Sequence, residues 1–296
     1  MTTTTLDHHA HHITPRDKLD FELGGDIPTY WFAGDPFKTR FFDAMSTIFP
    51  EGERFFISCV RDFRDQAAGD PELLQQIKDF IRQEGQHGIV HNEFNDRLKK
   101  QGIDVDQLEA TQRFIMFDIF RKYLPKKHTL ASTAAAEHLT AIMAHSFFER
   151  REVMAACDPR VRAMYAWHAM EEIEHKAVAF DVMQKVAKVW YPRRILAMLE
   201  VTLGFNINSL LVTRFMLKAD GFGGWQRLAM FARGLWWLYG WRGLISGNLR
   251  HYLSYYRPGF HPWQTGQMSA YQLWLDTLER TGNPILAGEA LHAAGT

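Results

Sequence analysis

Two copies of the pattern E-x-x-H constrain the fold of this 296-residue chain more than any other feature. They lie at Glu84–His87 and at Glu172–His175, each within a stretch whose apolar residues recur at helical spacing. Residues three apart on an α-helix are separated by about 60° around the axis and about 4.5 Å along it. The Glu and the His of each pair can therefore reach one metal ion. A third copy, Glu289–His292, stands among small residues, and we interpret it as accidental.

Apolar residues repeat with the helical period along most of the sequence, and we find no alternating strand pattern of any length. Pro50 is expected to separate two helices, and Asp70 with Pro71 to begin another. The expected helices span about 36–49, 51–67, 70–102, 104–123, 130–156, 159–188, 192–218, 223–255 and 264–280. The predicted fold class is all-α, and long helices joined by short connections favour a helical bundle.

Four segments are expected along the chain. Residues 1–34 are predicted to be a disordered polar tail, residues 35–190 the metal-binding bundle, residues 191–281 aromatic-rich helices packed on that bundle, and residues 282–296 a second tail. The first tail contains a histidine tract that can bind metal loosely, although disorder is the favoured interpretation. The tract consists of His8, His9, His11 and His12.

Composition excludes several classes of protein. Lys and Arg number 34, as do Asp and Glu, so the overall charge gives no indication of nucleic-acid binding. Cys59 and Cys157 lie far apart and form no CxxC, which excludes a disulfide framework and a zinc finger. We therefore expect a reducing, cytoplasmic location. The first residues lack the basic and apolar regions of a signal peptide.

The order of acidic residues around the two motifs predicts a dinuclear metal site. Bundles that hold two metal ions with carboxylates use one Glu from each of two helices and E-x-x-H from the other two. Here Glu53 precedes the first motif, and Glu137 lies between the motifs in the alanine-rich stretch STAAAEHL. A carboxylate buried there without a partner would be costly. The alternative is that these Glu and His residues lie on solvated faces or in core hydrogen bonds.

Further polar residues share the faces of the two motifs. His168 precedes Glu172 by four positions, which gives H-x-x-x-E-x-x-H on one helix face. Glu171 precedes His175 by four, so it could replace or support Glu172. His91 follows His87 by four and is expected to support a ligand or contact substrate, with direct ligation as the alternative. In a hydrolase, His91 or Glu171 could serve as the catalytic base.

The sequence resembles two families. The stretches FPEGERFF, FIRQEGQHGIVHNEFN, WHAMEEIEHKAVAFDV and RPGFHPW resemble the bacterial family of predicted transition-metal-dependent hydrolases over roughly residues 35–265. The ligand spacing alone is also similar to that of ferritin-like di-iron N-oxygenases of the aminobenzoate type. The second resemblance implies a ferritin-like four-helix bundle with a dinuclear site and seven metal ligands. These are Glu53, Glu84, His87, Glu137, His168, Glu172 and His175.

This ligand set has several possible chemistries. Four carboxylates and three imidazoles, without a thiolate, suit two Fe ions or two Mn ions. We favour an oxygenase or oxidase that uses O2 to oxidise an apolar or aromatic small molecule. The alternative is a metal-dependent hydrolase that uses activated water, and storage or a role without catalysis is the third hypothesis. The sequence does not identify an electron donor.

The stretches 193–218 and 230–263 are rich in Leu, Trp and Tyr. Polar residues such as Glu200 and Arg214 interrupt the first stretch, which argues against a membrane span. We expect these helices to pack on the bundle or to form a homodimer interface. The alternative is a peripheral membrane contact, in which Trp236 and Trp241 beside Arg233 lie among lipid headgroups.

Overall fold

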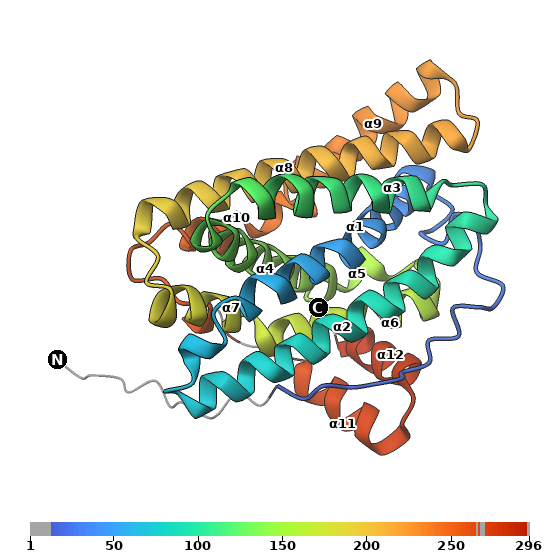
Figure 1. Ribbon diagram of the computed structural model, residues 1–296. Helices are drawn as coiled ribbons and strands as arrows, with labels where there is room; N and C mark the ends of the chain where they lie inside the picture. The colour runs from blue at the N-terminus through green and yellow to red at the C-terminus, as the bar shows by residue number, and fades with distance from the viewer. Residues whose placement is uncertain (1–12, 265, 267–269, 295–296) are drawn as a thin grey trace.

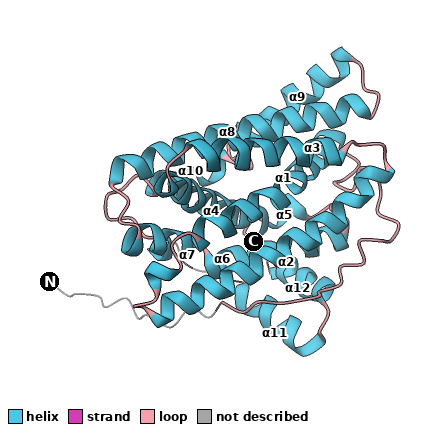
Figure 2. Cartoon of the chain, in the orientation of Figure 1, coloured by secondary structure: helices cyan, strands magenta, loops and turns pink. Residues whose placement is uncertain are grey.

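The structure is a computed structural model that describes residues 13–264, 266 and 270–294. Within these residues the chain is helical and contains no β-strand, apart from one isolated antiparallel bridge between Phe32 and Cys157 (Figure 2). The all-α prediction is therefore confirmed. The expected histidine tract at 8–12 lies outside the described residues.

Four long helices form the centre of the molecule (Figure 1). They are α1 (Pro36–Arg61), α2 (Pro71–Lys100), α4 (Lys126–Phe148) and α6 (Pro159–His175). Helix α1 packs against α2, and α4 packs against α6. Helix α8 (Tyr191–Ala219) lies across α1 and α4, while α11 (Tyr271–Thr281) and α12 (Pro284–Ala294) lie on the side of α6. The central helices are thus covered by C-terminal helices on two sides.

Three of the four central helices begin with the same dipeptide, Asp-Pro. Asp35, Asp70 and Asp158 each accept a hydrogen bond at the side chain from a backbone N–H in the first turn of α1, α2 and α6. The proline that follows has no N–H to leave unpaired and already has a helical φ angle. This local chemistry fixes where each helix starts, and so which turn of the helix reaches the centre of the bundle.

Pro50 does not end a helix, contrary to the prediction, because α1 continues through it from Pro36 to Arg61. A proline inside a helix removes the N–H that would bond to the carbonyl four residues earlier, here that of Ser46. In the structure the side-chain amide of Asn95, on α2, donates to the Ser46 carbonyl oxygen at 3.0 Å. The neighbouring helix therefore supplies the hydrogen bond that the proline removes, and the helix persists.

Several expected helices are divided in the structure. The segment expected at 104–123 is α3 (Val105–Arg113) followed by a π-helical stretch (Phe114–Arg121), and α5 (Arg151–Met154) is separate from α4. The segment at 159–188 contains α6, α7 (Val178–Asp181) and a π-helical turn (Val182–Val186), and 223–255 contains α9 (Gly224–Tyr239) and α10 (Leu249–Ser254). The division between α6 and α7 also separates two hydrophobic cores, because Met170 of α6 packs in one and Phe180 of α7 packs in the other.

Both expected tails are ordered where the structure describes them. Residues 13–34 cross the bundle and bury Phe21 and Trp31 in its main hydrophobic core. At the other end, residues 284–294 form α12, and Gly288 lies so close to α6 that an added Cβ would be 2.7 Å from the Cα atom of Ala163. The prediction missed residues 13–34 because polar residues, Gly and Pro interrupt them, and α12 because small residues fill many of its positions and mark no clear apolar face.

Removing the Asn95 amide tests its role in supporting Pro50. We expect Asn95→Ala to lower the free energy of unfolding by roughly 1–3 kcal/mol, because the buried Ser46 carbonyl loses its donor. In a Pro50→Ala background the same change is expected to cost less, since the backbone N–H of residue 50 then bonds to Ser46. Urea unfolding of the four proteins in the presence of a chelator measures both differences. Equal costs in the two backgrounds would contradict this account.

Candidate metal centre

Seven predicted ligands converge in the middle of the bundle. Helix α1 supplies one, α2 supplies two, α4 supplies one and α6 supplies three, and all are buried. They are Glu53, Glu84, His87, Glu137, His168, Glu172 and His175. The four helices thus bring together residues that lie up to 122 positions apart in the sequence.

The side-chain atoms fall into overlapping sets whose members all lie within 4.8 Å of one another. One set joins Glu53, Glu84 and His87, and another joins Glu84, Glu137 and His175. Glu84 belongs to both sets, so its carboxylate lies between two positions at which an ion could be held. Glu172 also lies between them, because one of its oxygens is 3.7 Å from Nδ1 of His87 and the other is 3.5 Å from Nε2 of His175.

The cluster is rich in buried atoms that lack partners. Both carboxylate oxygens of Glu53, Glu84 and Glu137 have no well-aligned hydrogen-bond donor among the described residues. Nδ1 of His87 and Nε2 of His175 likewise form no well-aligned hydrogen bond, although Nε2 of His175 is 3.0 Å from a Glu84 oxygen and 3.2 Å from a Glu137 oxygen. Buried polar atoms are rarely left in this state, and metal coordination would satisfy all eight. The residues therefore fit a pair of metal ions.

Burial and mutual repulsion shift the pKa values of the carboxyl groups. Burial is the main cause that raises the pKa of Glu137 to about 7, and the Glu172 charge adds to it. The pKa values of Glu53 and Glu84 are raised well above the usual range, again by burial and then by neighbouring carboxylates. Without cations these three carboxyl groups would therefore hold protons in place of charge, whereas His175 and His168 hold the pKa of Glu172 well below its usual range. Two divalent ions would balance four carboxylates.

Hydrogen bonds on the far side of the imidazoles orient two of the histidines. Nε2 of His87 is 3.1 Å from a Glu171 oxygen, and Nδ1 of His175 is 2.9 Å from Oε1 of Gln83. An imidazole that donates from one nitrogen presents a lone pair at the other. His87 is thus set to bind through Nδ1 and His175 through Nε2, the two nitrogens that lack partners.

His168 is oriented by a longer chain of hydrogen bonds. The Asn95 amide nitrogen donates to the Ser46 carbonyl, so the Asn95 carbonyl oxygen accepts from the Ser46 hydroxyl at 2.8 Å. The hydroxyl proton is then in use, and Nδ1–H of His91 donates to Ser46 Oγ at 2.8 Å. Nε2 of His91 must accept from Nδ1–H of His168, at 2.7 Å. Nε2 of His168 therefore keeps a lone pair, 3.0 Å from a Glu172 oxygen.

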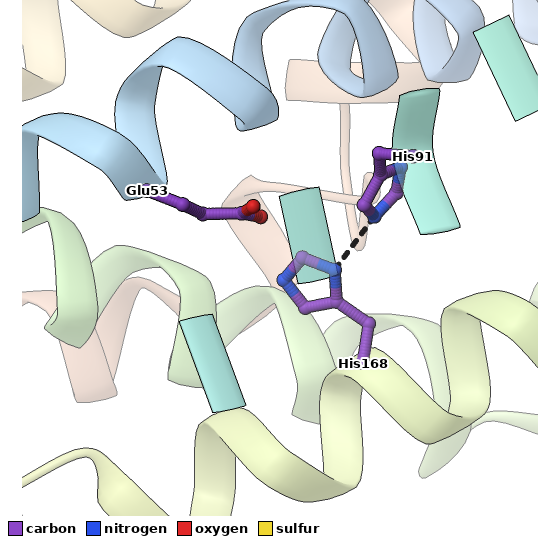
Figure 3. Close-up of side chains that lie close together, drawn as sticks. All are labelled: Glu53, His91 and His168. Atoms are coloured by element: carbon purple, nitrogen blue, oxygen red, sulfur yellow. Dashed lines mark hydrogen bonds between the residues drawn. The ribbon is translucent and has the colours of Figure 1, made fainter. Parts of the chain in front are cut away.

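Figure 3 shows the end of this chain. The Glu53 carboxylate, from α1, points toward the imidazole of His168, which is hydrogen-bonded to His91. Both nitrogens of His91 have partners, and the ring of Phe49 packs against His91 and His168 at centroid distances of 4.8 and 4.9 Å. His91 thus lies behind His168, although Glu53, His91 and His168 also have ligand atoms within 4.8 Å of one another.

Glu171 lies behind His87. One of its oxygens is 3.1 Å from His87, and the other accepts from the guanidinium of Arg16 at 3.1 Å. Burial is the main cause that raises the pKa of Glu171 to about 8, while Arg16 opposes the rise. Arg16 also pairs with Glu174 at 2.7 Å. Salt bridges from the N-terminal segment therefore hold Glu174 and Glu171 on α6, and Glu171 in turn contacts the ligand His87.

Sequence reasoning missed Arg16, Gln83, Ser46 and Asn95 as parts of the centre. Asn95 continues the series His87, His91 at the same four-residue interval, so helical spacing alone could have indicated it. Arg16 had no such signal, because it lies in a segment that was expected to be disordered. Glu289, from the third E-x-x-H, lies in the middle of α12, pairs with Arg162 of α6 and lies outside the cluster.

Replacing Glu137 with Gln separates its electrostatic cost from its value as a ligand. A carboxyl group whose folded pKa is raised destabilises the protein above its unfolded pKa, and the full cost is present above the folded value near 7. With metal removed, we expect Glu137→Gln to raise the free energy of unfolding by roughly 1–3 kcal/mol at about pH 8, and to have little effect at about pH 4.

With metal bound, we expect Glu137→Gln to be less stable than wild type. The variant lacks one carboxylate oxygen for coordination and therefore gains less stability from the ions. Urea unfolding with chelator and with added metal measures both states. Glu152→Gln, at an exposed position on α5, is the matched control. It should leave the free energy of unfolding unchanged both without metal and with it. A metal-free Glu137→Gln protein that is clearly less stable than wild type would show that Glu137 has a structural role.

Comparison with known proteins agrees with the sequence resemblance. The sequence profile of one family, described as predicted metal-dependent hydrolases, matches residues 14–266. No curated protein and no solved structure matches the chain. The matched range covers more than four-fifths of the 296 residues and includes every residue of the metal-binding cluster. The chain therefore belongs to the family of predicted metal-dependent hydrolases.

Proposed function

We propose that this chain is a dinuclear-metal enzyme with a ferritin-like bundle. The observation that carries the proposal is the convergence, from four helices, of buried carboxylate and imidazole groups in overlapping sets, with eight of their atoms lacking a well-aligned hydrogen bond. The arrangement of single Glu residues and E-x-x-H pairs on these helices is that of carboxylate-bridged dinuclear bundles. The seven ligands would be Glu53, Glu84, His87, Glu137, His168, Glu172 and His175, with Glu84 and Glu172 between the two ions.

The donor set favours iron, with manganese as the alternative, because it combines carboxylates with imidazoles and contains no thiolate. A bound iron pair would supply O2 activation, whereas the same residues holding two redox-inactive divalent ions would supply an activated water. The chain's own contribution is to orient the three imidazoles and to limit the access of water to the centre. Phe49, packed against His91 and His168, contributes to that exclusion.

Two reactions are supported by different observations. The family description supports hydrolysis. We retain O2-dependent oxidation as our proposal on the basis of the ligand set, and we note that the two residues expected to act as a base in a hydrolase are already engaged. His91 is bonded to Ser46 and His168, and Glu171 to Arg16 and His87. We therefore assign these two residues to positioning the ligands.

The adjoining cavities favour an apolar substrate. A small cavity of about 20 Å³ lies against His168 and Glu172, which is room for about one water molecule. Met143 and Phe147 line this cavity and also a second cavity of about 310 Å³. The larger cavity is lined mainly by apolar side chains and has the size of a small-molecule site. The body of the substrate would occupy it, with its reactive end directed between Met143 and Phe147.

Metal content tests the centre itself. We expect two ions per chain after anaerobic loading with ferrous iron, and less than one in His87→Ala, which removes a ligand. His292→Ala is the matched control, because it alters the third E-x-x-H on α12 and should keep both ions. Elemental analysis of the three purified proteins gives the ratios. Fewer than one ion per wild-type chain, or equal loss in both variants, would refute the dinuclear site.

Reaction with O2 tests the type of chemistry. We expect the reduced, iron-loaded protein to show an O2-dependent change in its optical spectrum, and His168→Ala to keep its metal but to show an altered rate or spectrum. A zinc-loaded protein should be inactive in the same assay and toward ester and amide probes. No optical change on mixing with O2, together with probe cleavage by the zinc form, would favour hydrolysis. Identical behaviour of His168→Ala and wild type would exclude His168 as a ligand.

A further inference from the structure

Helix α8 exposes a continuous aliphatic stripe. Five residues at intervals of three or four positions are between 49% and 63% exposed, and they are Leu196, Leu199, Leu203, Ile207 and Leu211. On an ideal helix they fall within about 120° of the helix circumference. The opposite side of α8, including Met198 and Met216, is buried on the bundle. The stripe is therefore an outward face that nothing in the described residues covers.

Exposed aromatic residues continue this face onto α9 and the residues that follow it. Trp225, Trp236 and Trp241 are 85%, 70% and 88% exposed, which is unusual for tryptophan. The Tyr239 hydroxyl donates to Asn206, which joins the end of α9 to the middle of α8. Helices α8 and α9 lie along one edge of the molecule (Figure 1). We name the exposed residues of 191–260, on α8, α9 and α10 and between these helices, the C-terminal face.

The charge of this segment is strongly one-sided. Residues 191–260 contain nine Lys and Arg but only two acidic residues, and the rest of the chain contains 25 Lys and Arg against 32 acidic residues. Both acidic residues are paired, Glu200 with His128 and Asp220 with Arg40. A cavity of about 340 Å³ on the same face is lined by Arg214, Lys218 and Arg227 together with two apolar side chains. Three cations beside apolar side chains match an anionic lipid headgroup and its acyl chain.

We propose that the C-terminal face docks on the surface of an anionic lipid bilayer, with α8 lying in the plane of the headgroups. Aliphatic, tryptophan and arginine side chains together are the combination found in helices that lie at a membrane interface. A second copy of the chain fits less well, because a symmetric dimer would bring two strongly cationic faces together. Helix α8 is long and apolar enough to span a membrane, but its inner face packs on α1 and α4.

The face is continuous with the larger apolar cavity. Thr202 and Asn206 of α8 and Leu249 of α10 line that cavity, and Leu249 is exposed at the surface. A docked molecule would therefore open its cavity toward the acyl chains, so that an apolar substrate could enter from the bilayer. This route of entry rests on the proposed function, whereas docking itself does not.

Vesicle flotation of the metal-loaded protein tests the docking. We expect binding to phosphatidylcholine vesicles that contain phosphatidylglycerol, weaker binding to phosphatidylcholine alone, and loss of binding at high salt. Leu203→Glu/Ile207→Glu should weaken binding by at least about ten-fold, since it places two anions in the stripe. Leu273→Glu, on α11 at the opposite edge of the molecule, is similarly exposed and should bind like wild type (Figure 1).

A second variant, Arg214→Glu/Lys218→Glu, should weaken binding to the anionic vesicles while leaving the stripe intact. Thermal unfolding and metal content should be unchanged in all variants, so a loss of docking is separable from a failure of the metal centre. The proposal is overturned if wild type does not bind anionic vesicles, or if Leu203→Glu/Ile207→Glu binds them as wild type does. It is also overturned if wild type is a dimer in solution that Leu203→Glu/Ile207→Glu converts to a monomer.

Discussion

The burial of four carboxylates within a few ångströms of one another is the constraint on which this structure depends. Isolated carboxylates at such positions are strongly disfavoured, and here burial and mutual repulsion raise the pKa values of Glu53, Glu84 and Glu137. The helices hold these groups together even though their interaction opposes folding. The packing of α1 on α2 and of α4 on α6, with α8 and α12 outside them, must therefore outweigh that repulsion. Such an arrangement is stable only with protons or cations in the cluster.

A single backbone irregularity is linked to the orientation of one ligand. Pro50 leaves the Ser46 carbonyl without its helical donor, and Asn95 supplies one. That hydrogen bond fixes the orientation of the Asn95 amide, which in turn fixes the direction of the Ser46 hydroxyl and the tautomer of His91. His168 then has only one nitrogen left for a metal ion. A proline that would normally break a helix is in this way part of the hydrogen-bond network that prepares the centre.

The sequence predicted the helical class and the seven candidate ligands, because E-x-x-H and the single Glu residues are read directly from local spacing. It could not predict the contacts behind the ligands. Arg16 reaches Glu171 and Glu174 across more than 150 positions, and no local pattern encodes such a contact. The continuity of α1 through Pro50 was also missed, since it depends on a side chain of another helix. The spacing of residues along one helix thus indicates which side chains share a face. Tertiary packing determines which residues of other segments those side chains contact.

The segments that sequence analysis treated as accessory determine how the centre is reached. Met143 and Phe147, on α4, stand between the small cavity at His168 and the larger apolar cavity. The far wall of that larger cavity is made by α8 and the residues around α10, which also form the exposed C-terminal face. Polarity therefore changes in order across the molecule, from a charged centre through an apolar cavity to a cationic, aromatic surface. An apolar substrate would meet favourable surroundings in the cavity that precedes the ligands, and a polar one would not.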